Sequence, residues 1–184
     1  MLIARSSLEA HLYMDLHACE CGAVSFDRQH HLEQRGDAMV AVYEGVCPEC
    51  GRARSFSFQM TDELPPPPPA FGGSNPSLIV DPGEFLLVSY RIATDTGLRL
   101  LNTPKAERRK YRAATEYGLA ALEEVLKFIP EGQDVVPPSA FTSERGRALY
   151  EKEPGKFARD LLENGVLATR QILAGIDRVS PPLS

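Results

Sequence analysis

All four cysteines of this 184-residue chain lie in two similar turns, and this arrangement constrains the fold more than any other feature. The first turn reads CECG from Cys19 and the second reads CPECG from Cys47, so that a glycine follows the second cysteine of each pair. Zinc in structural sites takes four tetrahedral ligands, and thiolates are common among them. Two such turns can supply a complete ligand set, provided that the fold brings them together.

We therefore expect one structural Zn²⁺ ion, bound by Cys19, Cys21, Cys47 and Cys50. A glycine after each pair allows the positive φ with which a chain leaves a tight turn. The first turn is one residue shorter than a C-x-x-C turn, and His17, two residues before it, is an alternative ligand in place of one thiolate. The position of both glycines favours the four-cysteine set. Four reduced cysteines without a metal are the remaining alternative, since a disulfide within one turn would be strained.

The CPECG turn resembles the knuckle of zinc-ribbon proteins, and CECG resembles a shortened partner knuckle. The resemblance covers residues 17–60 and implies an all-cysteine structural zinc site on a small, strand-rich unit. The whole chain, including its FGG and LKFIP segments, is similar to a group of uncharacterised bacterial proteins. That second similarity implies no function.

The composition is that of a globular protein, with 43% hydrophobic and 24% charged residues. No apolar run approaches the ~18 residues that a membrane span needs. The sequence begins without a basic leader followed by a small-residue cleavage site, so it does not resemble a secretory signal. We expect a cytoplasmic protein with no membrane partner, in which reducing conditions disfavour disulfides.

The first third of the chain changes from a helical to a strand-like pattern. Ser6 precedes leucines at positions 8, 12 and 16, which predicts a short helix with a serine cap. Apolar residues then alternate with polar ones and predict three antiparallel strands, around residues 24–26, 39–43 and 56–60. We expect His30 and His31 in an exposed turn, and the RGD at residues 35–37 in a turn before a strand.

The last hundred residues have helical patterns. Asp81, Pro82 and Glu84 form the signature of a capping box with proline at the first helical position. Further helices are predicted over residues 103–130, 142–153 and 153–177. We expect an α+β fold, a zinc-ribbon-like antiparallel sheet with a C-terminal helical bundle. Its parts are an N-terminal helix and sheet (1–62), a Pro/Gly-rich connector (63–77) and a helical region (78–184).

The net charge of −5 is concentrated in the first part of the chain. Residues 1–104 carry seven basic and thirteen acidic side chains, a balance of −6, whereas residues 105–184 carry thirteen basic and twelve acidic ones, a balance of +1. Nucleic-acid binding depends on lysine and arginine contacts with phosphates. The sequence therefore favours a non-catalytic protein that binds another, basic protein, for example a toxin-neutralising immunity protein.

A nucleic-acid-binding zinc-ribbon regulator is the first alternative. It would use a basic cluster near the start of the predicted helix 103–130, formed by Lys105, Arg108, Arg109, Lys110 and Arg112. Nearby acidic residues such as Glu107 and Glu116 could equally neutralise these charges, which would leave an ordinary solvated face.

A zinc-dependent hydrolase or deaminase is the second alternative. His31 and Glu33 before Cys47-x-x-Cys50 resemble the H-x-E and P-C-x-x-C elements of zinc deaminases. Here the proline lies inside the cysteine pair, and the other two cysteines would have no role. A four-thiolate site also leaves zinc no open position for water, so the sequence identifies no catalytic residue.

Overall fold

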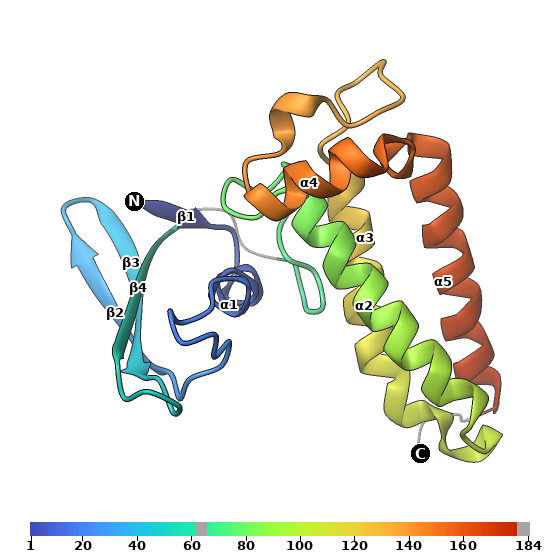
Figure 1. Ribbon diagram of the computed structural model, residues 1–184, viewed down its shortest axis with the longest axis horizontal. Coiled ribbons are helices and arrows are strands. Elements are labelled where there is room, and N and C mark those ends of the chain that lie inside the picture. The colour runs from blue at the N-terminus through green and yellow to red at the C-terminus, as the bar shows by residue number, and fades with distance from the viewer. Residues whose placement is uncertain (62–65, 180–184) are drawn as a thin grey trace. The chain divides into compact units, whose positions relative to one another are not determined.

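The computed structural model describes residues 1–61 and 66–179 of the chain (Figure 1). The chain divides into two compact units, Met1–Val80 and the remainder from Asp81 onward. In the residues described, the first unit contains a mixed four-stranded sheet and one helix, and the second is built from helices, so the protein has an α+β fold. Residues 63–65 of the predicted connector lie outside the described residues, and residues 66–77 form neither helix nor strand.

The first unit begins with a short strand, β1 (Leu2–Ala4), followed directly by α1 (Ser7–Leu16). The Ser6 side chain accepts a hydrogen bond from the Glu9 N–H and so caps α1, as the sequence predicted. Arg5 lies between the two elements, and its guanidinium donates to the buried Glu9 carboxylate. Because both charged groups are buried, this ion pair fixes the turn from strand to helix.

Three longer strands complete the sheet: β2 (Gln29–Arg35), β3 (Ala38–Val46) and β4 (Ala53–Met60). The strand order is β1-β4-β3-β2. The pairs β2–β3 and β3–β4 are antiparallel, and the pair β1–β4 is parallel. The sheet is therefore mixed and not purely antiparallel as predicted. The parallel strand was missed because three residues are too short for a period-two pattern to be recognised.

The strand predicted at residues 24–26 is wrong, since these residues form a loop. Phe26 is nevertheless buried, because its ring packs beside Phe56 and not because it pairs with a strand. His30 and His31 lie in β2 and not in a turn, where they face Tyr43 and Val42 across the ladder. The turn predicted at RGD is confirmed, and Gly36 adopts φ +63° there.

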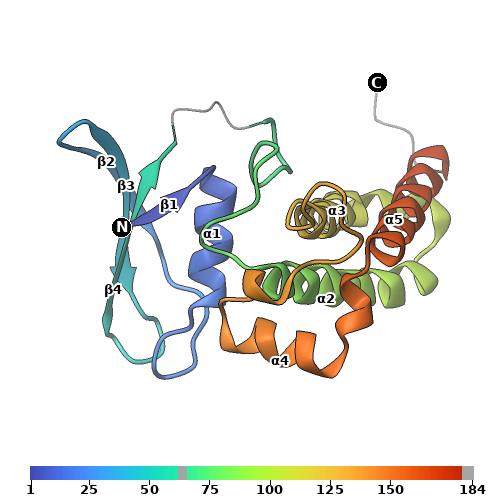
Figure 2. The same cartoon turned by 90° about the horizontal axis from the view of Figure 1, so that it is seen from above.

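The core of the first unit lies between α1 and one face of the sheet, as Figures 1 and 2 show. Its buried members are Ala4, Ala10, Met14, Phe26, Ala41, Tyr43 and Phe58. Tyr13 of α1 meets the rings of Phe56 and Phe58 edge to face, which is a favourable arrangement for aromatic quadrupoles. The cysteine turns follow the C-terminal ends of α1 and β3.

The described part of the second unit contains four α-helices: α2 (Pro82–Leu101), α3 (Arg112–Leu126), α4 (Glu144–Lys152) and α5 (Arg159–Val179). Three 3₁₀ segments connect them: η1 (Lys105–Tyr111), η2 (Pro138–Ala140) and η3 (Pro154–Phe157). α3 packs against both α2 and α5. Buried apolar side chains such as Leu86, Val125 and Leu162 form the core of this unit.

Asp81 confirms the predicted helix start and also connects two helices. Its carboxylate accepts the Glu84 N–H within the capping box, and it also accepts the backbone N–H groups of Thr142 and Ser143 before α4. Gly83 and Gly146 meet so closely that a Cβ on Gly83 would lie 2.5 Å from the Cα of Gly146. The start of α2 is therefore fixed by charge-assisted hydrogen bonds and by backbone contact.

The single helix predicted over residues 103–130 is divided in the structure. Residues 105–111 form the 3₁₀ segment η1, and the α-helix begins only at Arg112. Consecutive cations at a helix N-terminus oppose the helix dipole, which disfavours extending α3 toward residue 105. The last predicted helix is divided in the same way, with η3 before α5. No helix among the described residues is long and apolar enough to cross a membrane.

Candidate metal centre

Each cysteine turn lies at the end of a regular element of the first unit. The first turn follows α1, which ends at Leu16, and the second connects β3, which ends at Val46, to β4. In the first turn the Cys19 N–H donates to the Ala23 carbonyl, at 2.8 Å, and in the second the Cys47 N–H donates to the Arg52 carbonyl, also at 2.8 Å. The two turns thus close by the same type of hydrogen bond.

The first turn is one residue shorter than the second, and its inner hydrogen bond also spans one residue fewer. Gly22 N–H donates to the carbonyl of Cys19, three residues back, whereas Gly51 N–H donates to Cys47, four residues back. Both glycines have positive φ, +93° at Gly22 and +72° at Gly51, as the sequence predicted. CECG and CPECG are therefore two sizes of the same turn.

The structure brings the four cysteine sulfurs to one point. All four Sγ atoms lie within 4.8 Å of one another, with 3.6 Å between Cys19 and Cys50 and 3.5 Å between Cys21 and Cys47. Zn–S bonds of about 2.3 Å in a tetrahedron would separate the sulfurs by roughly 3.8 Å, close to the arrangement found. The sulfurs are too far apart for disulfides, and all four cysteines are free. The donor set therefore fits a tetrahedral metal ion.

His17 is not part of this cluster. Among the described residues, the group able to hold one ion consists of the four cysteines alone. The His17 ring is stacked on Tyr13 at 3.8 Å between ring centroids, and its Nδ1 lies 2.7 Å from the Tyr13 carbonyl oxygen, at the end of α1. The imidazole therefore completes the helix end and does not point to the sulfurs.

The turns set the pKa values of two thiols in opposite directions. The backbone N–H of Cys50, followed by that of Glu49, stabilises the Cys47 thiolate and lowers its pKa to about 6. The Cys21 thiol also receives a backbone hydrogen bond, at Ala23, but its shared hydrogen bonds with Cys47 and Cys50 outweigh this, and its pKa rises to about 12. Four sulfurs this close cannot all be ionised without a cation, and a divalent metal would replace their protons.

Two arginines that sequence reasoning missed hold the turns in place. Arg52, after the second turn, forms an ion pair with Glu20 inside the first. The Arg54 guanidinium is buried over the ring of Phe26, 4.4 Å from its centroid, and donates to the carbonyl oxygens of His17 and Val24 on either side of the first turn. The sequence holds no signal for these contacts, because the partners are about thirty residues apart.

The residues of the enzymatic alternative are not brought to the cysteines. His31 hydrogen-bonds to Glu33 on the exposed edge strand β2, at 2.9 Å. It pairs with Val42, four residues before the end of β3 at Val46, so about 13 Å of strand separates it from the second turn. An H-x-E element at this position has no access to the metal centre.

In the basic cluster of the nucleic-acid alternative, Arg109, Lys110 and Arg112 form ion pairs with carboxylates. Arg112 forms ion pairs with Glu116 and Asp177, and Arg109 also lies 3.8 Å from Asp177. Lys110 pairs with Glu107, at 3.3 Å. These contacts lower the local positive potential, as the neutralised-face interpretation of the sequence expects.

Comparisons of the chain with protein-family models, with curated proteins and with solved structures found no match. The likeness to zinc ribbons therefore rests on the two cysteine turns and on the meeting of their sulfurs. A four-cysteine site of this geometry is suited to binding a metal.

Proposed function

We propose that this protein is a non-catalytic zinc-binding protein, in which one Zn²⁺ held by Cys19, Cys21, Cys47 and Cys50 stabilises the sheet unit. The observation that carries the proposal is the convergence of the four sulfurs within 4.8 Å. Four thiolates fill the coordination sphere of zinc, so the ion has no position for a reacting water. Its contribution is to folding, since the free energy of binding the ion becomes folding free energy.

The first test is the metal content of the full-length protein. We expect one zinc per chain and four thiols protected from alkylation, with all four becoming reactive after chelation. Because protons compete with the metal for the thiolates, zinc should be released as the pH falls. A zinc-free protein with a folded sheet unit and four accessible thiols would contradict the proposal.

We further propose that the protein acts by binding another, basic protein. The support is the charge of −6 over residues 1–104, which include the unit that carries the four-cysteine site. Complementary charge steers association and disfavours wrong partners. Neutralisation of a toxin by a cytoplasmic immunity-type protein is the concrete form of this proposal.

Affinity capture from the native host tests the second part, with the zinc-loaded full-length protein as bait and Cys47→Ser as matched control. We expect a defined basic protein that is retained by the wild-type bait at low salt and lost from the control. Recovery of no such protein across several growth conditions would refute this part and leave the zinc site standing.

The alternatives receive less support from the geometry. The pairing of Lys110 and Arg112 with carboxylates does not favour nucleic-acid binding. Weak, salt-insensitive retention on a polyanion column is therefore expected. Strong retention, lost when the five basic residues of the cluster are changed to Ser, would reverse this order of the hypotheses.

A further inference from the structure

Helix α5 carries a second apolar face beside the one that packs in the core. The core face includes Leu162, Val166 and Ile176, each buried. The second face, here called the α5 stripe, follows a 4-3-4-3-4 spacing and consists of Leu161, Gly165, Ala168, Ile172, Gly175 and Val179. Leu161 and Ile172 are 49% and 48% exposed. Apolar residues repeated every 3.5 positions are typical of a helix that pairs with another helix.

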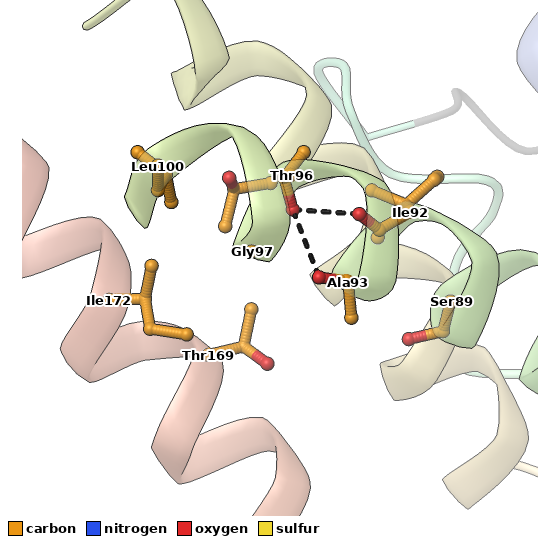
Figure 3. Close-up of a pocket in the computed structure, with 10 residues that line it drawn as sticks. Ser89, Ile92, Ala93, Thr96, Gly97, Leu100, Thr169 and Ile172 are labelled. Carbon is orange, nitrogen blue, oxygen red and sulfur yellow. Dashed lines mark hydrogen bonds between the residues drawn. The ribbon is translucent and has the colours of Figure 1, made fainter. Parts of the chain in front are cut away.

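The stripe continues into a groove between α2 and α5. The groove has a volume of about 50 Å³, and Gly118 of α3 contributes to its lining. Figure 3 shows Thr169 and Ile172 of α5 on one side, and Gly97 and Leu100 of α2 on the other. No charged side chain lines it. Its small residues allow the backbone of an incoming helix to approach closely.

The order of residues in the stripe is self-complementary. If a second α5 lies antiparallel with its centre at Arg170, Ala168 meets Ile172 of the other copy. Gly165 lies at the border with the core face, since a Cβ there would be 3.0 Å from the Leu122 side chain of α3. Leu161 then meets Val179, so that large residues cover the two ends of the contact. A two-fold interface requires one patch to be complementary to itself, and this arrangement has that property.

The charges beside the stripe match the same orientation. Asp160 and Arg178 lie eighteen residues apart, which is five turns of α-helix, and therefore on the same flank of α5. An antiparallel pair places Arg178 of one copy beside Asp160 of the other, twice by symmetry. A parallel pair would instead leave Asp160 and Arg178 of the two copies on opposite sides of the contact, where these charges would not meet.

From this spacing, exposure and charge, we propose that the α5 stripe is the interface of an antiparallel homodimer. In this dimer, the α5 helix of a second copy covers the stripe and the adjoining edge of the groove. The inference concerns the helical unit only, so its failure would leave the zinc proposal untouched.

The test is the oligomeric state of the zinc-loaded full-length protein, measured by sedimentation over a wide range of concentration. We expect a dimer that Ala168→Glu dissociates, with a rise of about 100-fold or more in the dissociation constant, because the variant buries an unpaired charge. Ala174→Glu is the matched control, since Ala174 is an exposed alanine of the same helix outside the stripe. A wild-type protein that is monomeric throughout, or a dimer that both variants weaken equally, would overturn the proposal.

Charge reversal tests the orientation. Arg178→Asp should weaken the dimer by about tenfold, since it replaces two exposed attractions by repulsions, and adding Asp160→Arg should restore it. Circular dichroism of each variant establishes that α5 remains helical. A dimer in which the double variant stays as weak as Arg178→Asp alone would exclude the antiparallel pairing.

Discussion

The sheet unit and the helical unit differ in whether a candidate metal site accompanies the apolar core. In the first, seven buried residues form a cluster between α1 and one face of the sheet, and four cysteine sulfurs meet at one end. In the second, buried side chains come from α2, α3 and α5 and from the connecting segments, and no cysteine is present. A metal ion adds its binding free energy to the folding of the unit that holds it, so the two units should respond very differently to loss of metal.

The largest expected effect is the loss of the metal. Cys47→Ser removes a buried cysteine of the proposed zinc site, and structural zinc sites contribute on the order of 10 kcal/mol to folding. Hydrogen exchange should then show that residues 1–60 lose protection while α2, α3 and α5 keep theirs. Ser25→Ala, an exposed change in the loop after the first turn, is the control and should alter neither. If residues 1–60 of Cys47→Ser stayed protected from hydrogen exchange, the two units would not differ in their dependence on the metal.

The reverse experiment concerns the core of the helical unit. Leu86 of α2 is fully buried, and Leu86→Ala should lower the free energy of unfolding of this unit by about 2–5 kcal/mol without changing the zinc content. Leu98 lies in the same helix but is 61% exposed, so Leu98→Ala should change it by less than about 0.5 kcal/mol. Denaturant unfolding followed by helix signal measures both, and equal effects would contradict the assigned core.

A smaller effect is expected from the arginine that supports the first turn. Arg54→Lys keeps the charge but cannot reproduce the planar contact with Phe26 or the paired donors to His17 and Val24. We expect zinc affinity to fall about tenfold, which is typical when a residue that orients the metal ligands is changed. Competition with a chromophoric chelator measures this affinity. An unchanged affinity would show that the turns hold their shape without this side chain.

The smallest effect should come from the surface of the helical unit. Lys110 and Glu107 form an exposed pair, so Lys110→Ser should change the free energy of unfolding by less than about 1 kcal/mol. Thermal unfolding in low and high salt measures this directly. A larger loss would mean that the basic cluster is part of the packing and not an ordinary solvated face.

Local sequence patterns predicted local structure well. Ser6 and Asp81 cap the helices expected of them, and both glycines after the cysteine pairs have the positive φ that was predicted. These features depend on residues a few positions apart, which the sequence displays directly. The gathering of the four cysteines was also predictable, because metal chemistry alone requires it.

Features that depend on distant partners were missed. β1 exists because three residues find a parallel neighbour in β4, more than fifty positions later. Arg54 appears in the sequence as an ordinary strand residue, although it contacts the loop around the first turn. The loop at Phe26 was predicted as a strand because its apolar and polar residues alternate. Such alternation indicates which side chains are buried, and Phe26 is buried by packing on the Phe56 ring and not by strand pairing.

The two edges of the sheet have a consequence for solubility. β1 is only three residues long, and β2 presents exposed polar and charged side chains, among them Glu33 and Arg35. Short or charged border strands give other chains little opportunity to hydrogen-bond alongside them, which is how proteins with open sheets avoid amyloid-like growth. Self-association of this protein is thereby steered away from strand addition.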